Sequence, residues 1–374
     1  YEGDDRKPIF NPHTIIKVRP KSLEGSESRA LLFKAHRLAS RYGTPYFANL
    51  CQGWQGGASY LATGTRLATD WTGDLELDTF RTGALDSVII NLPRIAYEAK
   101  GKDERFFKLL EETLGKVKTA LEIKYRVIDD RMEHKLLPFL SQPVTGEHYF
   151  RLKNSTHLIS FAGLNEATKT HTNHEIHEDK SALSFAVKTV NFMASYARRH
   201  SRKPGVRLVV SQTPNDDATQ RLTVLDIEEY GWAIVKAQGT RETPCYTNFV
   251  SIPLEAEIPL KERIRLEEEF HPLITGGHLL PIELKEPEQD PEKLFSTTEQ
   301  ICHSNKVGLI TYTRSLSYCT NCLETFGDFQ QKCPKCKSSA SIVHYGRSSA
   351  QYTPLKWWNE AKALNVSKRC GYAL

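Results

Sequence analysis

Apolar residues recur at helical spacing in two long segments of this chain. In residues 28–42 they stand three or four positions apart, and Gly43 follows as an expected helix C-cap. The clearer pattern starts at Asp103, which we expect to cap a helix with one apolar and one charged side. The apolar side carries Phe106, Phe107, Leu110, Leu114, Val117 and Leu121. Both segments are therefore predicted to be amphipathic helices that pack on a core.

Three short apolar runs predict buried strands. They are residues 88–90, which end before Pro93, residues 158–161 and residues 208–210. A further helix is expected from about residue 181 to residue 199, between the second and third runs. Alternation of strands and helices of this kind favours an α/β domain with mainly parallel strands. The charged, proline-containing residues 285–293 predict a turn or a short linker.

Four cysteines near the C-terminus form two CxxC knuckles, Cys319-Thr-Asn-Cys322 and Cys333-Pro-Lys-Cys336, with ten residues between them. Two residues between thiolates let both sulfurs of a knuckle reach one ion, and two knuckles complete a tetrahedral four-sulfur shell. The alternative is two unrelated redox pairs. We predict a structural Zn²⁺ site in a zinc ribbon. Because a four-thiolate shell leaves no open position, this site points to architecture and not to catalysis.

The composition is that of a folded domain. Of 374 residues, 39% are hydrophobic and 25% are charged, and the net charge of +5 is spread along the chain without a basic tail. No apolar run approaches the roughly 18 residues that span a bilayer. Cys51, Cys245, Cys302 and Cys370 lie far apart in sequence, which suits a reducing cytoplasm better than a disulfide framework. The start at Tyr1, without Met, favours a piece of a longer protein over a processed terminus.

Polar groups follow the predicted strands, where ligands bind in α/β folds. Asn165 and Glu166 come after one strand, and the segment from Ser211 to Asp217 follows the next. Gly276-Gly277, between two histidines, places flexible backbone where the chain must turn sharply or approach a ligand closely. A tight turn or a solvated loop explains these segments equally well from the residues alone.

Two further clusters have simpler interpretations. His171, His174 and His177 stand three apart and could share one side of a helix as metal ligands, but their strongly polar neighbours favour a solvated helix end. The pair Trp357-Trp358 after Pro354 predicts packing of the tail onto the main domain.

Several segments stand in the order found in the anaerobic, class III ribonucleotide reductases, which are glycyl-radical enzymes. These segments are Tyr42-Gly-Thr-Pro-Tyr-Phe-Ala-Asn49, Ile90-Asn-Leu-Pro-Arg-Ile-Ala-Tyr97, Gly163-Leu-Asn-Glu166, Thr213-Pro214, Tyr246-Thr-Asn248, Thr275-Gly-Gly-His278, the two knuckles and residues 354–359. From about residue 12 to its end, the chain resembles the C-terminal portion of this family. The resemblance implies an α/β fold with a ten-stranded barrel, incomplete here, over residues 1–315. It also implies a zinc-binding module with the radical loop and tail over residues 316–374.

The resemblance implies a reaction as well, the anaerobic reduction of ribonucleoside triphosphates to deoxyribonucleoside triphosphates, which supplies DNA precursors. In this family an S-adenosylmethionine-dependent iron–sulfur activase installs a glycyl radical, and formate or a small redox protein is the reductant. The expected assembly is a homodimer. Asn165, Glu166, Ser211 and Thr213 are candidates for substrate binding by motif position.

The radical residues depart from the family pattern. A finger-loop cysteine normally abstracts the ribose hydrogen, but Thr65 stands at the matching position of Ala62-Thr-Gly-Thr-Arg-Leu67, and Cys51 is the nearest thiol in sequence. A hydroxyl cannot replace the thiol, because its O–H bond is much stronger. The radical glycine matches either Gly346 or Gly371, of which the second lies in Arg369-Cys-Gly-Tyr372. Alignment on the tail instead places Ala350 where the glycine belongs.

Two other functions stay open. A reductase-like protein that has lost the radical cysteine and glycine would keep the barrel for nucleotide binding or regulation, and Thr65 and Ala350 favour this alternative. A zinc-ribbon nucleic-acid binder would need a basic face with interleaved aromatic residues. Lys332, Lys335, Lys337 and Arg347 near Tyr345 are a sparse version of such a face.

Overall fold

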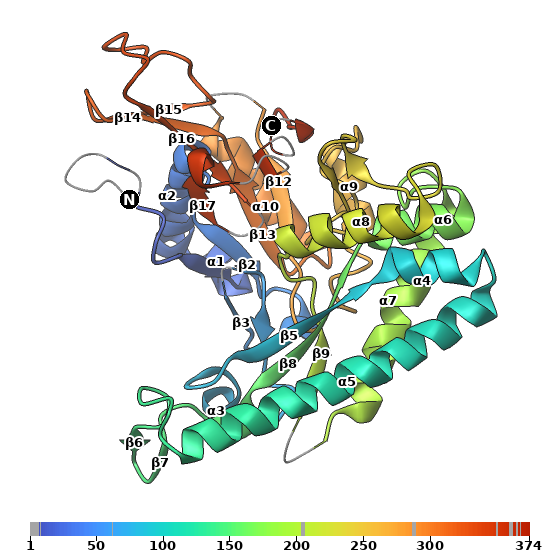
Figure 1. The fold of residues 1–374 in the computed structure, drawn as a ribbon. Helices are drawn as coiled ribbons and strands as arrows, with labels where there is room; N and C mark the ends of the chain where they lie inside the picture. Colours follow the sequence, from blue (N-terminus) through green and yellow to red (C-terminus); the bar gives the residue numbers. More distant parts are fainter. Residues whose placement is uncertain are drawn as a thin grey trace.

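The computed structural model describes residues 7, 9–61, 63–202, 206–285, 289–348, 351–358, 362–363, 366 and 368–374. The chain forms two sheets that carry helices on their outer sides, and a third, antiparallel sheet near the C-terminus (Figure 1). The third sheet projects from one end of the molecule, whereas the longest helix, α5, runs along the opposite side (Figure 1).

The first sheet is wholly parallel, as the alternation of strands and helices predicts. It consists of β5 (Ala84–Asn91), β8 (Thr156–Ala162) and β9 (Arg207–Val210), in that order. Its centre is apolar, since Ile90 stands opposite Phe161 and Ile159 stands opposite Val210. All three expected strands are therefore confirmed.

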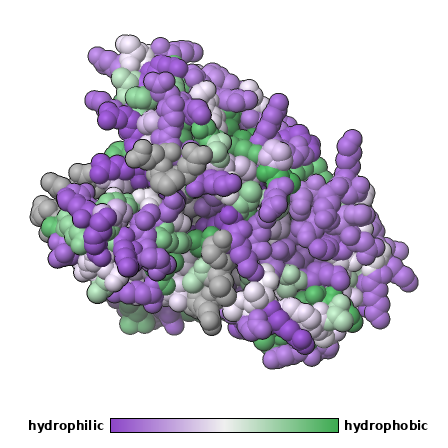
Figure 2. Space-filling model, turned by 90° about the horizontal axis from the view of Figure 1, so that it is seen from above, coloured by the Kyte–Doolittle hydropathy of each residue, from purple (hydrophilic) through white to green (hydrophobic). Residues whose placement is uncertain are grey.

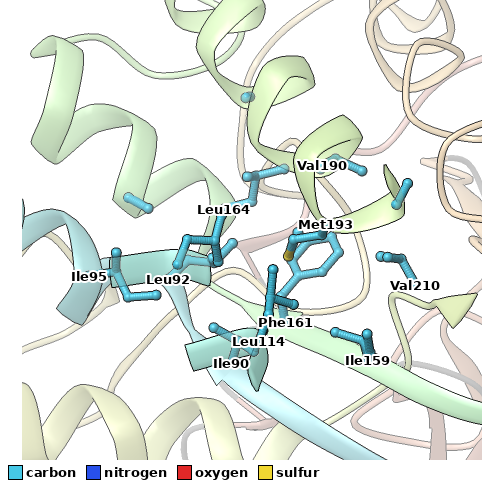
Figure 3. Packing of buried hydrophobic residues seen from close by; sticks show 14 of the residues in the cluster. Ile90, Leu92, Ile95, Leu114, Ile159, Phe161, Leu164, Val190, Met193 and Val210 are labelled. Carbon is cyan, nitrogen blue, oxygen red and sulfur yellow. The ribbon is translucent and has the colours of Figure 1, made fainter. Parts of the chain in front are cut away.

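Helices from the same half of the chain cover this sheet. They are α4 (Leu92–Ala99), α5 (Asp103–Glu133), α6 (Leu164–Thr172), α7 (Lys180–His200) and α8 (Asp216–Tyr230). Leu114 of α5 and Met193 of α7 meet Phe161 of β8 in one buried cluster (Figure 3). Truncating one such side chain to Ala costs about 2–5 kcal/mol, because a cavity remains in a close-packed interior. This cluster holds α5 and α7 on the sheet.

The start of α5 differs from the expectation for Asp103. Lys102 is the N-cap residue, and Asp103 is the first residue of the helix. The carboxylate of Asp103 instead accepts hydrogen bonds from His171 and Lys188, both at 2.8 Å. Asp103 therefore ties α5 to α6 and α7, and its negative charge still favours the positive end of the helix dipole.

The second sheet joins strands from the two ends of the chain. Its order is β1 (Ile15–Val18), β2 (Tyr46–Asn49), β13 (Leu309–Thr313) and β12 (Leu280–Glu283). The outer pairs are parallel, and β2 is antiparallel to β13. In the described part of the chain this sheet and the first one are separate in their hydrogen bonding.

Helices from the two ends of the chain cover the second sheet. These are α2 (Ser26–Tyr42) and α10 (Pro291–Ser304), with the short α1 (Pro20–Glu24) before α2 and α9 (Leu260–Glu267) before β12. Gly43 ends α2 in the left-handed region at φ 67°, as expected for a C-cap glycine. Buried His36 of α2 bonds Thr298 of α10 at 2.7 Å, which joins the two helices.

The third sheet carries the cysteine knuckles. Its order is β15 (Glu324–Gly327), β14 (Leu316–Cys319), β16 (Ile342–Arg347) and β17 (Tyr352–Pro354), all antiparallel. Phe10 near the N-terminus stacks on Tyr352 with ring centroids 4.5 Å apart, so the two ends of the chain share a small core here. Trp357 is 71% exposed, so the expected packing on the main domain is wrong for this residue, whereas Trp358 is half-buried.

The remaining elements are short. They are the pairs β3 (Ser59–Tyr60) with β4 (Arg66–Leu67), β6 (Pro143–Val144) with β7 (Glu147–His148) and β10 (Gln238–Gly239) with β11 (Pro244–Cys245), and the helix α3 (Leu75–Thr79). Figure 2 shows a face covered mainly by hydrophilic residues, with hydrophobic residues in small groups. None of the helices in the described residues is long and apolar enough to span a membrane.

Candidate functional site

The four cysteines of the knuckles converge. The Sγ atoms of Cys319 and Cys336 are 3.5 Å apart, and those of Cys322 and Cys333 are 3.4 Å apart. All four sulfurs lie within 4.8 Å of one another. A tetrahedral zinc ion with Zn–S distances of about 2.3 Å would place its sulfurs about 3.8 Å apart, so this donor set fits Zn²⁺.

Each knuckle is closed by the same turn. The N–H of Leu323 donates to the carbonyl of Cys319 at 2.9 Å, and the N–H of Lys337 donates to the carbonyl of Cys333 at 3.0 Å. Both closing residues have left-handed backbone, at φ 57° and φ 62°. Hydrogen bonds from the Asn321 side chain and the Ser338 backbone lower the pKa of the Cys336 thiol to about 6, which favours a metal-binding thiolate. This cluster is the one group of three or more potential ligands found among the described residues.

The backbone of the C-terminal tail docks beside β12, and the Arg369 side chain also donates to the Arg347 carbonyl at the end of β16 at 3.0 Å. The N–H of Tyr372 donates to the Glu283 carbonyl at 2.8 Å, and the N–H of Lys285 donates back to the Tyr372 carbonyl at 3.0 Å. The N–H of Cys370 donates to the Leu254 carbonyl at 2.8 Å. Gly371 therefore lies at the edge of the second sheet, where a Cβ would come within 3.0 Å of the Lys285 Cα.

Gly346 lies in a different environment. It is in β16, between β14 and β17, opposite Thr353. A Cβ at this position would stand 2.8 Å from the Trp358 ring and 3.0 Å from Leu355 Cδ1. The structure thus separates the two candidate glycines into two sheets, and Ala350 lies outside the described residues.

Thr65 lies at the tip of the β3–β4 hairpin and is buried. The tip rests on the Gly276-Gly277 turn, since the N–H of Arg66 donates to the Gly276 carbonyl at 2.8 Å. A Cβ built on Gly277 would overlap the carbonyl oxygen of Gly64, and its φ of 115° also requires glycine. The two glycines therefore allow a close approach between backbones at the hairpin tip.

A buried carboxylate and two buried histidines flank this turn in sequence: Glu267 and His271 precede it, and His278 follows it. His278 Nε2 is 2.8 Å from the Glu267 carboxylate, and the His271 and His278 rings are 4.4 Å apart. The Gly308 N–H donates to His271 Nδ1 at 3.2 Å, so the His271 proton is on Nε2. Neither His271 Nε2 nor His278 Nδ1 has a hydrogen-bond partner in the described structure. Desolvation, followed by the charge of His278, lowers the pKa of His271, which keeps that ring neutral.

The two residues expected after β8 are buried in the first turn of α6. The Asn165 side chain accepts from the Ile176 N–H at 3.1 Å and donates to Glu175 at 3.2 Å. Glu166 accepts from the N–H of Thr247, the Thr247 hydroxyl and the Gln238 amide. Burial raises the pKa of the Glu166 carboxyl. The side chain of Asn165 thus has protein partners on both its polar atoms.

The two candidate substrate-binding residues after β9, Ser211 and Thr213, make hydrogen bonds to different parts of the structure. The Ser211 hydroxyl donates to the carbonyls of Gly276 and Gly277 at 3.2 and 3.3 Å, below the hairpin tip. The Thr213 hydroxyl lies 2.9 Å from Ser160 and 3.2 Å from the amide of Asn215. The Asn215 N–H donates to Asn248 at 2.9 Å. Hydrogen bonds therefore link Thr213 to the segment that also binds Glu166.

A cavity of about 70 Å³ borders this network. Its lining residues include Asp216, Cys245, Thr247, Asn248, Leu254 and Arg369. Burial, followed by the charge of Glu166, raises the pKa of the Cys245 thiol to about 12. The cavity brings a thiol, all three residues of the Tyr246-Thr-Asn248 segment and the tail into one place.

The other cysteine and histidine candidates lie elsewhere. Cys51 is half-buried after β2, and its thiol donates to the Val18 carbonyl at 3.8 Å. Interaction with the Cys302 thiol on α10 lowers the pKa of Cys51. His171 binds Asp103, and His177 lies 3.8 Å from Glu175. These histidines form no metal cluster within the described residues.

Several residues of the site were not found from the sequence. Glu267 comes from a segment with no motif of its own, Cys302 was noted only as an isolated cysteine, and Arg66 lies in the 62–67 segment without having been assigned a role. Arg66 directly follows Thr65, and its guanidinium donates to Gln55, Thr275 and Trp54. The position of Arg66 directly after Thr65 was the sequence signal that could have identified Arg66 as part of the site.

A protein-family model described as anaerobic ribonucleoside-triphosphate reductase matches residues 1–372. The chain belongs to this family.

Individual members of the anaerobic ribonucleoside-triphosphate reductase family are distant. The Haemophilus influenzae enzyme is 23% identical over 208 residues, which cover 52% of this chain and 28% of that protein. The bacteriophage T4 enzyme is 24% identical over 206 residues, which cover 54% of this chain and 33% of that protein.

Solved structures show the same fold. The anaerobic ribonucleotide reductase of Thermotoga maritima, in complex with dATP and CTP, has a TM-score of 0.73 at 18% identity and covers 95% of this chain. Hydroxyproline dehydratase from Clostridioides difficile has a TM-score of 0.60 at 10% identity and covers 97% of this chain. The present chain spans 55% and 53% of those two chains. It therefore has the mixed α/β fold of anaerobic reductases over about half of their length.

Proposed function

We propose that this chain is the C-terminal catalytic portion of an anaerobic ribonucleoside-triphosphate reductase, with Gly371 as the radical residue. The docked Arg369-Cys-Gly-Tyr372 tail is the main support, because it combines a matching sequence with two backbone hydrogen bonds at the end of β12 and a third to Leu254. We expect residues 1–315 to be the barrel portion of this chain. In the complete protein, upstream strands would join its two sheets to complete a ten-stranded barrel. Residues 316–374 would supply the zinc module, the radical loop and the tail.

Gly371 is favoured over Gly346 by what activation requires. An activase must reach the glycine Cα to remove a hydrogen atom, so the segment must leave its place and return. Gly371 is held at the edge of a sheet, beside the single bridge between Leu284 and Tyr372. Gly346 is in a central strand of the zinc sheet, and releasing it would break two strand pairs.

The proposed chemistry needs a thiol that passes a hydrogen atom to the glycyl radical. The S–H bond breaks, the glycine Cα–H bond forms and a thiyl radical remains. We propose Cys245 for this role, because it lines the cavity that Arg369 of the tail also lines. Its pKa of about 12 keeps it as S–H, the form that donates a hydrogen atom. Cys51 is the second candidate, but a thiyl radical there would meet the Cys302 thiol.

The substrate would be a ribonucleoside triphosphate, bound where β8, β9 and the 244–255 segment meet. Thr213, Ser211 and Glu166 border this region through the hydrogen bonds described above, and Asn165 would position α6 because its amide is bound by protein groups. We expect an S-adenosylmethionine-dependent activase, formate or a small redox protein as reductant, a homodimer and a cytoplasmic location. The zinc ion would be structural.

A catalytically silent, nucleotide-binding homologue is the second candidate. Thr65 favours it, because the family position for the reactive thiol holds a hydroxyl at the hairpin tip. The two candidates differ in product formation. We expect the complete, activated protein to convert CTP to dCTP without oxygen, the Cys245→Ser variant to be inactive and Cys51→Ser to retain turnover. No product from wild-type protein that carries a radical would support the silent homologue.

A further inference from the structure

Cys51 and Cys302 form a pair of thiols that the proposed reduction does not use. Cys51 follows β2, and Cys302 lies in the last turn of α10. Both residues pack on the same apolar core, and the interaction between the two thiols shifts the pKa of each. The fold therefore brings together two cysteines from opposite ends of the sequence.

The backbone around the pair is held by further bonds. The Gln52 amide donates to the Cys302 carbonyl at 3.0 Å, and the Asn49 amide donates to the Val307 carbonyl at 2.9 Å. The Cys51 N–H donates to the Asn49 side chain at 3.0 Å. Residues 49–52 are thus fixed against the end of α10, and the Cys51 thiol donates to the Val18 carbonyl at 3.8 Å.

The two thiols differ in the way that thiol–disulfide exchange requires. Cys51 is half-buried and reachable from solvent, whereas Cys302 is fully buried. Interaction with the Cys302 thiol lowers the pKa of Cys51, and the same interaction together with burial raises the pKa of Cys302. The thiolate is the nucleophile in exchange, so the accessible sulfur is the one prepared to attack.

We propose that Cys51 and Cys302 are a redox-active dithiol that exchanges with low-molecular-weight disulfides. Cys51 sulfur attacks one sulfur of the disulfide, whose S–S bond breaks and releases one thiol. Cys302 sulfur then attacks the Cys51 sulfur of the mixed disulfide and releases the second thiol. Two electrons and two protons pass from the pair to the small disulfide, and the Cys51–Cys302 bond is left in the protein.

The pair lies where its oxidation changes the chain that enters the hairpin. Residues 53–58 connect Cys51 to β3, and the hairpin tip carries Thr65 against Gly276-Gly277. A disulfide would tie the beginning of this segment covalently to α10. This dithiol is independent of whether Gly371 carries a radical, since it needs neither an activase nor a nucleotide.

The test is exchange with glutathione disulfide on the folded, reduced, zinc-loaded protein under anaerobic conditions. Remaining thiols are alkylated in denaturant, and the peptides are identified by mass spectrometry. We expect wild-type protein to contain a Cys51–Cys302 cross-link that dithiothreitol removes. Cys302→Ser should stop at the first step and hold one glutathione on Cys51, and Cys51→Ser should leave Cys302 free to be alkylated. Cys245→Ser is the matched control and should retain the cross-link.

Three results would overturn the proposal. One is full alkylation of Cys51 and Cys302 in wild-type protein after prolonged exposure to glutathione disulfide. Another is a glutathione that stays on Cys51 of the wild type, because Cys302 would then not resolve it. The third is a cross-link from Cys51 to Cys370, which packs on the same core.

Discussion

The hydroxyl of Tyr372 accepts a hydrogen bond from Nε of Arg263 at 2.7 Å. Arg263 is 1% exposed, and its other nitrogens donate to the carbonyls of Ile252, Pro253 and Ala256. A buried guanidinium with unpaired donors is costly, because it has lost its hydration. The tail therefore completes the bonding of a charged group inside the main domain, which explains how the end of the chain is held beside β12.

Tyr372→Phe tests this link. Removing the hydroxyl leaves a buried, charged donor without an acceptor, which should lower the free energy of unfolding by about 1.5–3 kcal/mol. Urea unfolding measures the loss, and limited proteolysis should cut the tail faster. Tyr125→Phe, at a half-buried tyrosine on α5, is the control and should change stability by less than about 0.5 kcal/mol. Equal stabilities for both variants would mean that Tyr372 does not anchor the tail.

The approach of the hairpin to Gly277 predicts a second large effect. Gly277→Ala should cost at least about 2 kcal/mol, because the new Cβ is strained at positive φ and also meets the Gly64 carbonyl. Gly73→Ala is the matched control, since Gly73 also has positive φ but open space around its Cβ position. It should cost only the backbone strain of about 1 kcal/mol. Thermal unfolding compares the two, and equal losses would contradict a close hairpin contact.

The four-cysteine cluster predicts one zinc ion per chain. Cys333→Ser should lose the metal and loosen β14–β17, because three thiolates hold Zn²⁺ more weakly than four. Cys245→Ser should keep the metal, because its sulfur is outside the cluster. Elemental analysis of freshly purified, reduced protein measures both. Wild-type protein that contains no zinc would contradict the assignment of the four cysteines as a zinc site.

The stability of the folded protein should decrease as the pH is lowered, because two histidines are buried in their neutral form. Desolvation lowers the pKa of His36 and of His157 to about 4 from 6.5 in the unfolded chain. The unfolded state then binds more protons below pH 6.5, so stability is complete above that pH and declines as the pH falls toward 4. Each histidine contributes about 1.4 kcal/mol per pH unit in that window.

His157→Phe isolates one of these contributions. Neither ring nitrogen of His157 has a hydrogen-bond partner in the described structure, so Phe should fit with little loss at pH 7. Between pH 6.5 and pH 4 the variant should lose stability less steeply than the wild type, because its unfolding takes up one proton fewer. Urea unfolding at several pH values gives the slopes. Identical slopes would indicate that His157 is protonated in the folded protein.

Local sequence patterns correctly predicted the features that are determined by residues close together in the sequence. The 3.6-residue period gave α5 and α7, and the CxxC spacing gave the zinc ligands, because both are determined within a few residues. The N-terminus of α5 was assigned wrongly because Asp103 found partners on α6 and α7, which are distant in sequence.

Contacts between distant segments could not be predicted. The pairing of Tyr372 with Leu284, the hairpin on Gly277 and the contact of Cys51 with Cys302 each join segments far apart in the chain. The sequence identified Gly346 and Gly371 as equal candidates, because Gly346 lies near the expected distance from the knuckles whereas Gly371 has the neighbours that look most like the signature. Only their positions in different sheets distinguish them.

The most direct test of the account is the electron paramagnetic resonance spectrum of the complete natural protein, incubated without oxygen with its activase, S-adenosylmethionine and a reductant. We predict a glycyl doublet in the wild type and in Gly346→Ala, and its loss in Gly371→Ala, with zinc content unchanged in both variants. A doublet that persists in Gly371→Ala, or no doublet in wild-type protein with an activase of proven activity, would contradict the assignment of Gly371 as the radical residue.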